Sequence, residues 1–231
     1  MIEKILEYER ELFLLLNSFH SPFFDQFMWF YSGLAYWIPL LVSFIIILFY
    51  ANRQRWKEML LIIAAIIVVI LLCDRFSSGF CKPFFSRLRP THHPNFMNDV
   101  MTVFGYRGSS YGFISSHAAN GFGFATITSL IFRNKYFSVS IFLWATVSAY
   151  SRIYLGVHFI SDIIPGIASG LFFAWITFRL FKFAHKKIFL KRKQYDDFPS
   201  KGLVIILFLL ILTIALMVII SLLLAYREAC F

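Results

Sequence analysis

The stretch EMLLIIAAIIVVILLCDRF, residues 58–76, has no charged residue between Glu58 and Asp74. A helix needs roughly 20 mostly apolar residues to cross the hydrocarbon core of a bilayer. Leu, Ile, Val and Ala fill most of this stretch, and neither Gly nor Pro interrupts it. It therefore predicts a helix that spans a membrane.

Five further apolar stretches accompany this one along the chain. The 231 residues are 59% hydrophobic and include 30 Phe, and the mean hydropathy is +0.72. A soluble domain of this length would need far more polar surface. We therefore expect an all-α, polytopic membrane helical bundle with about six transmembrane helices, at about residues 26–50, 58–76, 117–132, 136–152, 159–181 and 203–225.

The N-terminal segment, residues 1–20, mixes charged and apolar side chains. A cleavable secretory signal has an uninterrupted apolar centre, which this segment lacks. The pattern instead predicts an amphipathic helix that lies in the membrane interface. Its charged residues are Glu3, Lys4, Glu7, Glu9, Arg10 and Glu11.

The net charge of +10 is unevenly spread among the predicted loops. Alternating spans place three loops on one side of the membrane, and the positive-inside rule makes that side cytoplasmic. Thirteen of the 22 basic residues fall on it: Arg53, Arg55, Lys57, Arg133, Lys135, Arg179, Lys182, Lys186, Lys187, Lys191, Arg192, Lys193 and Lys201.

The opposite side receives both termini and the segments 77–116 and 152–158. These two segments contain five cations, which weakens the charge asymmetry: Lys82, Arg87, Arg89, Arg107 and Arg152. If the five cations bind an anion instead of setting the topology, the conflict disappears.

Three short polar segments on that opposite side carry the chemistry. The clearest contains Ser151, Arg152, His158 and Asp162. When His158 opens a helix, Asp162 lies four residues later on the same face. Its carboxylate can then hold one ring nitrogen and leave the other free to attack a substrate.

The other two segments contribute hydroxyl groups and cations. Ile114-Ser115-Ser116-His117 opens the third span, where Ser115 is either a simple N-cap or part of a phosphate site at a helix N-terminus. Lys82 and Arg89 flank the end of the second span. Juxtamembrane cations are commonly snorkelling anchors, and they also suit the oxygens of a phosphate.

Together the three segments resemble the motifs of the type-2 phosphatidic acid phosphatase family, relatives of the vanadium haloperoxidases. Residues 82–90 match K-x6-R-P and residues 151–162 match S-R-x5-H-x3-D in full. The middle motif, P-S-G-H, is altered, because Ile114 replaces Pro and Ser116 replaces Gly. The resemblance covers roughly residues 20–182.

The resemblance implies a role for each matched residue. His158 is the nucleophile that forms a phosphohistidine, Asp162 orients it, and His117 protonates the leaving group. Lys82, Arg89, Arg152, Ser115 and the backbone of Ser116 hold the phosphate. The chain then divides into an interfacial helix (1–20), a phosphatase core (21–182), and a basic loop with an extra transmembrane helix (183–231).

No metal or other cofactor is expected. The family works without one, Cys73, Cys81 and Cys230 form no metal-binding spacing, and His92 and His93 are assigned to a solvated loop. The expected partners are the bilayer and a lipid substrate: an anionic phospholipid such as phosphatidylglycerol phosphate, lipid A, or a polyprenyl diphosphate. Nucleic acid is not among them.

Three other functions compete with lipid dephosphorylation. A phosphotransferase would pass the phosphate to another lipid, and the motifs do not distinguish it. A lipid transporter would bind the headgroup without cleavage, but it needs no His/Asp pair and usually has repeated halves. Vanadium haloperoxidase chemistry belongs to a soluble branch of the relatives.

The expected location is the inner membrane of a bacterium, with the active site facing the periplasm. In a variant lacking the three native cysteines, a single cysteine near Asn95 should react with a membrane-impermeant reagent in intact spheroplasts. A cysteine near Gln194 should react only after lysis. The reverse labelling pattern would place the active site in the cytoplasm.

Overall fold

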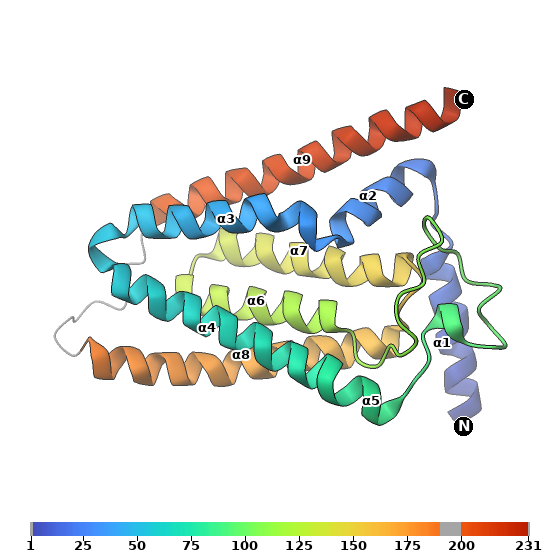
Figure 1. Ribbon diagram of the computed structural model, residues 1–231, viewed down its shortest axis with the longest axis horizontal. Coiled ribbons are helices and arrows are strands. Elements are labelled where there is room, and N and C mark those ends of the chain that lie inside the picture. Colours follow the sequence, from blue (N-terminus) through green and yellow to red (C-terminus); the bar gives the residue numbers. More distant parts are fainter. Residues whose placement is uncertain (1, 190–199, 231) are drawn as a thin grey trace.

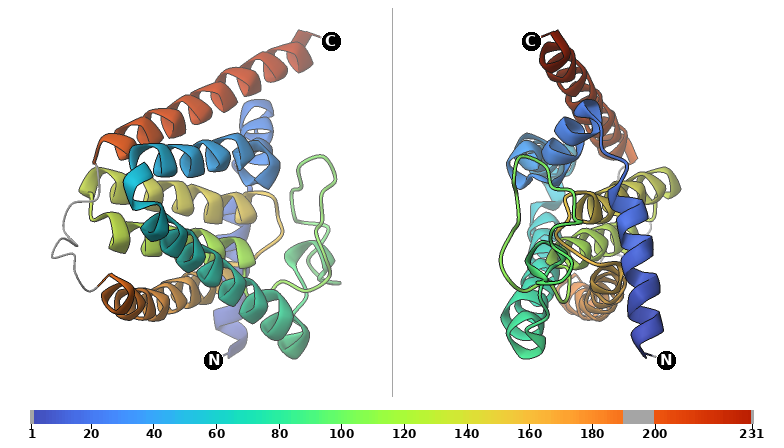
Figure 2. Two further views of the ribbon diagram at one scale, coloured as in Figure 1. Left: turned by 60° about the vertical axis from the view of Figure 1, so that its left-hand side comes forward. Right: turned by 90° about the vertical axis from the view of Figure 1, so that its right-hand side faces the viewer.

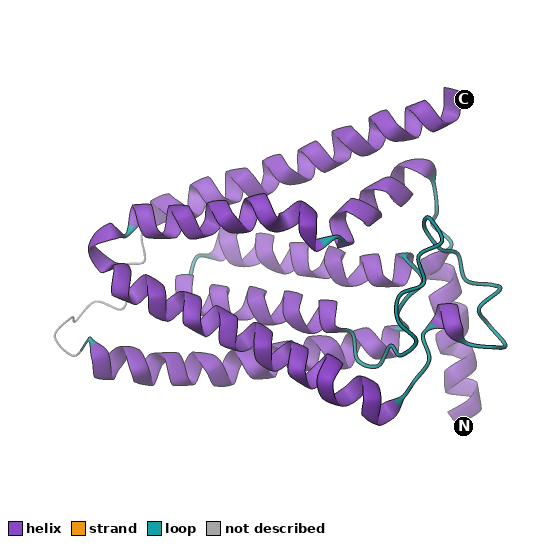
Figure 3. Cartoon of the chain, viewed as in Figure 1, coloured by secondary structure: helices purple, strands orange, loops and turns teal. Residues whose placement is uncertain are grey.

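The chain folds into an all-helical bundle, as expected. The computed structural model describes residues 2–189 and 200–230, and within them no strand forms (Figure 3). The basic residues Lys191, Arg192 and Lys193 lie outside the described residues. The α-helices are α1 (Ile2–Asn17), α2 (Pro22–Ser32), α3 (Leu34–Ala51), α4 (Trp56–Asp74), α5 (Lys82–Phe85), α6 (Ser116–Phe132), α7 (Lys135–Tyr154), α8 (Ile160–Ile188) and α9 (Ser200–Cys230).

Among the described residues, four helical segments are long and apolar enough to span a bilayer. They are Leu34–Ala51, Arg53–Phe85, Ile160–Ile188 and Gly202–Glu228. The shorter α6 and the more polar α7 run alongside them in the bundle (Figure 1). The chain is thus a multi-pass membrane protein, while the expected count of six spans is not confirmed.

The first predicted span, residues 26–50, is not one helix. Helix α2 ends at Ser32 and α3 begins at Leu34, because Gly33 between them is extended (φ −81°, ψ 117°). A Cβ at Gly33 would lie 2.8 Å from the Tyr36 ring, so the absence of a side chain permits the bend. The hydropathy of the stretch is continuous across Gly33, which is why a hydropathy pattern does not reveal the break.

The second predicted span continues further than expected. After α4, a π-helical segment (Arg75–Cys81) joins α5, so the helical path reaches Phe85. Lys82 therefore extends from the same helical rod that contains the apolar stretch 58–76.

Helices α6 and α8 pack closely through small residues. A Cβ at Gly170 would lie 2.4 Å from the Ala119 carbonyl oxygen, and one at Gly166 would lie 2.7 Å from the Ser115 carbonyl oxygen. A Cβ at Gly123 would lie 2.9 Å from the Val69 side chain of α4. At Gly121, in contrast, a Cβ would make only ordinary contacts with α7.

The two ends of the bundle differ in character. One end holds the α3–α4 and α6–α7 connections and the end of α8, and these contain the described basic loop residues (Figure 1). The other end holds both termini, the long segment between α5 and α6, and α1, which lies across the bundle (Figures 1 and 2). The division of the chain at residues 20 and 182 stays a prediction.

The α6–α8 contact gives a test of stability. In Gly170→Ala the new methyl group would collide with the backbone of α6, and overpacking of this kind costs about 1–3 kcal/mol. We expect a lower Tm in detergent and reduced activity. Gly79→Ala is the matched control, because a Cβ at Gly79 meets nothing within 4 Å. Equal Tm values for the two variants would contradict the close packing.

Candidate active site

The structure brings the three polar segments together at the end of the bundle that holds the termini. Lys82 comes from α5, and Arg89 from the segment after it. Ser115 caps α6, and Ser116 and His117 are its first two residues; Arg152, His158 and Lys82 lie close enough to His117 to interact with it electrostatically. Arg152 lies in the last turn of α7, His158 precedes α8, and Asp162 lies in its first turn.

His158 and Asp162 form the expected pair. Nδ1 of His158 lies 3.3 Å from Oδ2 of Asp162, which also accepts a hydrogen bond of 3.0 Å from the Phe159 backbone N–H. The side chains are 2% and 0% exposed. With its proton on Nδ1, facing the carboxylate, the imidazole carries its lone pair on Nε2.

Arg89 lies directly at that lone pair. Its Nη1 is 3.0 Å from Nε2 of His158 and donates a hydrogen bond of 2.8 Å to the Val157 carbonyl. Nη2 donates to Oγ of Ser109 at 3.2 Å. Burial, and then the charge of Arg152, lower the pKa of Arg89 to about 10, so the guanidinium stays charged at neutral pH.

Two glycines in the segment before α6 make room for these groups. Gly108 has a positive φ of 70°, and a Cβ there would lie 3.3 Å from Cζ of Arg89. A Cβ at Gly112 would lie 3.0 Å from Oδ2 of Asp162. The segment thus closes over the site with backbone rather than side chains.

Lys82 is held by hydroxyl groups. Its Nζ donates to Oγ of Ser116 at 2.8 Å and to Oγ of Ser78 at 3.2 Å, and the two hydroxyls are 2.9 Å apart. Ser116 therefore does more than replace a glycine, because its hydroxyl connects the first motif to the second. It is helical and has no positive φ, so the Gly-to-Ser change needs no unusual backbone.

Ser115 acts as an N-cap and as a backbone link. Its Oγ accepts from the Ala118 N–H at 3.4 Å, which agrees with the simple capping interpretation. Its own N–H donates to the Asp162 carbonyl at 3.0 Å. This bond joins the start of α6 to the first turn of α8.

Arg152 contacts two residues, Ser32 and Tyr106, that the sequence patterns did not indicate as part of the site. It donates to the hydroxyl of Ser32, and its Nη2 lies 3.4 Å from the Tyr106 hydroxyl. The Ser32 backbone also interacts with His117. Ser32 is the last residue of α2, so the break at Gly33 is what makes its polar groups available. Because the sequence predicted one continuous span over residues 26–50, no sequence pattern indicated that Ser32 belongs to the site.

The charges in the site favour the binding of an anion. Burial is the main reason that the pKa of His158 lies well below its usual value of 6.5, and nearby Arg89, Arg152 and Lys82 lower it further. His158 is therefore a neutral imidazole at pH 7. Nε of Arg89 and Nε of Arg152 are both buried without a hydrogen-bond partner. The arrangement can hold a phosphate group and attack it with Nε2.

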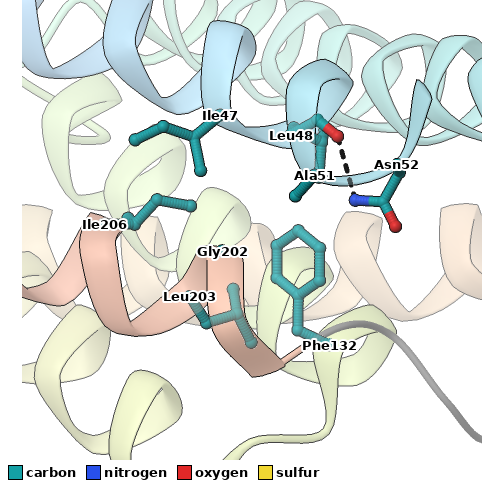
Figure 4. Close-up of a pocket in the computed structure, with 8 residues that line it drawn as sticks. All are labelled: Ile47, Leu48, Ala51, Asn52, Phe132, Gly202, Leu203 and Ile206. Carbon is teal, nitrogen blue, oxygen red and sulfur yellow. Dashed lines mark hydrogen bonds between the residues drawn. The ribbon is translucent and has the colours of Figure 1, made fainter.

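Other polar clusters and cavities lie elsewhere. His92 and His93 are half-buried rather than solvated, and His93 lies 3.4 Å from Arg10 of α1. Among the described residues, no three His, Cys, Asp or Glu gather as a metal site would require. A small pocket (Figure 4) lies at the opposite end of the bundle, and it is lined by Ile47, Leu48, Ala51, Asn52, Phe132, Gly202, Leu203 and Ile206.

Comparison with known proteins places this site in context. A family model described as the PAP2 superfamily matches residues 58–186. A lipid A 4'-phosphatase of Porphyromonas gingivalis is 46% identical over 186 residues, which cover 80% of this chain and 78% of the relative. A lipid A 4'-phosphatase of Bacteroides thetaiotaomicron is 34% identical over 203 residues, covering 87% and 88%.

Two solved structures share the fold. Aquifex aeolicus LpxE aligns with a TM-score of 0.52 and 25% identity, over 73% of this chain and 93% of that one. A transmembrane PAP2-type phosphatidylglycerolphosphate phosphatase from Bacillus subtilis aligns with a TM-score of 0.59 and 22% identity, over 83% and 90%. The second likeness concerns the fold alone.

The geometry makes His158 the residue to test. His158→Ala removes the nitrogen that faces Arg89, and the loss of a nucleophile should raise the reaction barrier by several kcal/mol. We expect no measurable phosphate release, with Tm and membrane insertion retained. His92→Ala, outside the site, should stay active. A folded His158→Ala variant with near-normal activity would remove His158 from the reaction.

Proposed function

This chain belongs to the PAP2 superfamily, and from that membership we propose that it removes a phosphate from lipid A through a phosphohistidine at His158. It is an integral membrane lipid phosphatase, as its relatives are. The identity of 46% to a lipid A 4'-phosphatase supports lipid A, and its 4'-phosphate, as the substrate.

The proposed first step is attack on phosphorus. Nε2 of His158 forms a bond to phosphorus as the bond to the sugar oxygen breaks, and His117 gives that oxygen a proton. Burial and the nearby cations disfavour protonation of His117, and the negative charge of the bound phosphate offsets this. The positive charge that develops on the imidazole is balanced by Asp162, 3.3 Å from Nδ1. Lys82, Arg89 and Arg152 neutralise the phosphate oxygens, where the charge-assisted donors of Arg are most effective.

The second step releases phosphate to water. The deprotonated His117 takes a proton from a water molecule, whose oxygen attacks phosphorus and breaks the bond to Nε2. Inorganic phosphate leaves, and both histidines return to their starting states. The three cations supply the charge that a bound metal ion would otherwise supply, so the proposed reaction is metal-independent.

We further propose that the site faces the periplasm from the inner membrane. The described basic loop residues lie at the end of the bundle opposite His158, which supports this orientation (Figure 1). The five cations that disturbed the sequence asymmetry lie at the other end. Among them, Lys82, Arg89 and Arg152 line the site.

A substrate panel tests the proposal. Purified enzyme in detergent, with EDTA present, should release phosphate from lipid A that carries only a 4'-phosphate, and much less from lipid A that carries only a 1-phosphate. Orthovanadate should inhibit, because it adopts the trigonal-bipyramidal geometry expected between His158 and the leaving oxygen.

Three results would contradict it. Reversible loss of activity in EDTA, restored by magnesium or zinc, would mean that a metal takes part. Activity on phosphatidylglycerol phosphate or a polyprenyl diphosphate, with none on lipid A, would assign another substrate. Transfer of labelled phosphate to a second lipid instead of water would identify a phosphotransferase.

A further inference from the structure

The N-terminal helix α1 reaches the candidate active site through one carboxylate. Oε2 of Glu9 accepts a hydrogen bond of 3.0 Å from Nη2 of Arg87. Nη1 of the same guanidinium donates to Oδ1 of Asp162 at 2.9 Å. A carboxylate–guanidinium–carboxylate chain therefore connects α1 to the carboxylate that contacts His158.

Helix α1 is anchored well enough to hold Glu9 in place. Phe13 is fully buried, with its ring centroid 5.7 Å from that of Phe96 and 5.4 Å from that of Phe159. At the end of α1, the Asn17 side-chain amide donates to the carbonyls of Ile153 and Tyr154 at 3.1 and 2.9 Å. These contacts dock α1 on the end of α7 and the start of α8.

Glu9 also binds α8 directly. Its Oε1 accepts a hydrogen bond of 2.9 Å from the Ser161 backbone N–H. Ser161 is the second residue of α8, where backbone N–H groups have no partner inside the helix and negative charge is favoured. One side chain of α1 thus contacts both the backbone next to Asp162 and the guanidinium bound to Asp162.

The two carboxylate oxygens of Asp162 contact different groups. Oδ2 faces Nδ1 of His158, while Oδ1 binds Arg87. If the charge of the Arg87 guanidinium acted on Asp162 alone, it would offset the negative charge of the carboxylate. Less negative potential would then remain to stabilise the imidazolium that forms when His158 attacks. Glu9 supplies a second negative charge to Arg87 and restores that potential.

We propose that Glu9 and Arg87 are positioning residues for Asp162, so that the docking of α1 at the membrane interface controls the reactivity of His158. This inference rests on the phosphohistidine mechanism proposed above. Glu9 lies outside residues 58–186, which match the family model, and outside the three motifs. Its role follows from contacts between segments 78 residues apart or more.

The test is a double-mutant cycle on the full-length protein in detergent, with lipid A as substrate and Tm measured in parallel. Glu9→Gln keeps the shape of the side chain and removes its charge. We expect kcat to fall about tenfold, which corresponds to about 1.4 kcal/mol, with KM changed less than kcat. Glu11→Gln is the matched control, because Glu11 is exposed on the same helix, and it should behave as wild type.

The second arm places Glu9→Gln in an Arg87→Gln background. If Glu9 acts through Arg87, its removal there should change kcat little, since the guanidinium that it balances is gone. Equal losses in both backgrounds would mean that Glu9 acts only through the Ser161 backbone, which overturns the proposal. Full activity of Glu9→Gln would also overturn it.

A further variant separates stability from positioning. If Glu9→Gln lowers Tm, Glu9→Asp, which keeps the charge, should restore kcat in part. Recovery of Tm without any recovery of kcat would contradict the proposal. Failure of the phosphohistidine mechanism itself would appear differently, as an active His158→Ala variant.

Discussion

The close contact between α6 and α8 is the constraint on which the site depends. Gly166 and Gly170 let the two backbones approach until a Cβ would lie 2.7 and 2.4 Å from the carbonyl oxygens of Ser115, which caps α6, and of Ala119. Ser115 N–H then reaches the Asp162 carbonyl at 3.0 Å. This contact sets the distance between the segment that contains His117 and the one that contains His158. Because a shift of about 1 Å in reacting groups can cost roughly 100-fold in rate, the proposed reaction would require this rigid backbone packing.

The second consequence of that packing is a concentration of positive charge. Arg89 and Arg152 are 5% and 4% exposed, and burying cations is costly unless they find partners. The protein supplies mostly neutral ones: hydroxyls of Ser32, Ser109 and Tyr106, and the Val157 carbonyl. The charge on these guanidinium groups thus remains available for the phosphate of the proposed substrate. Burial, together with the same cations, keeps His158 neutral, which is the state that the proposed nucleophile requires.

Much of this arrangement was predictable, because short-range spacing decides it. The four-residue interval from His158 to Asp162 predicted the contact between them, which forms although α8 begins only at Ile160 and His158 precedes it. The long apolar stretches can only be buried in lipid or against one another. The break at Gly33 was not predictable, because a hydropathy average over many residues does not reveal that one of them is extended. The contacts of Ser32 and Glu9 were hidden for a different reason. They join segments distant in sequence, and a single sequence contains no signal for such pairs.

The distribution of charge along the bundle connects the site to the membrane. The sequence showed basic residues on both predicted sides, which is a poor topological signal. In the structure, the described loop cations lie at one end, and Lys82, Arg89 and Arg152 gather at the other around His158. If the second group binds the phosphate of the substrate, as proposed, it does not act as a topological signal and does not oppose the positive-inside rule. A bundle of this kind can keep a strongly cationic site on its less basic side, with α1 lying across the end where a lipid headgroup would enter.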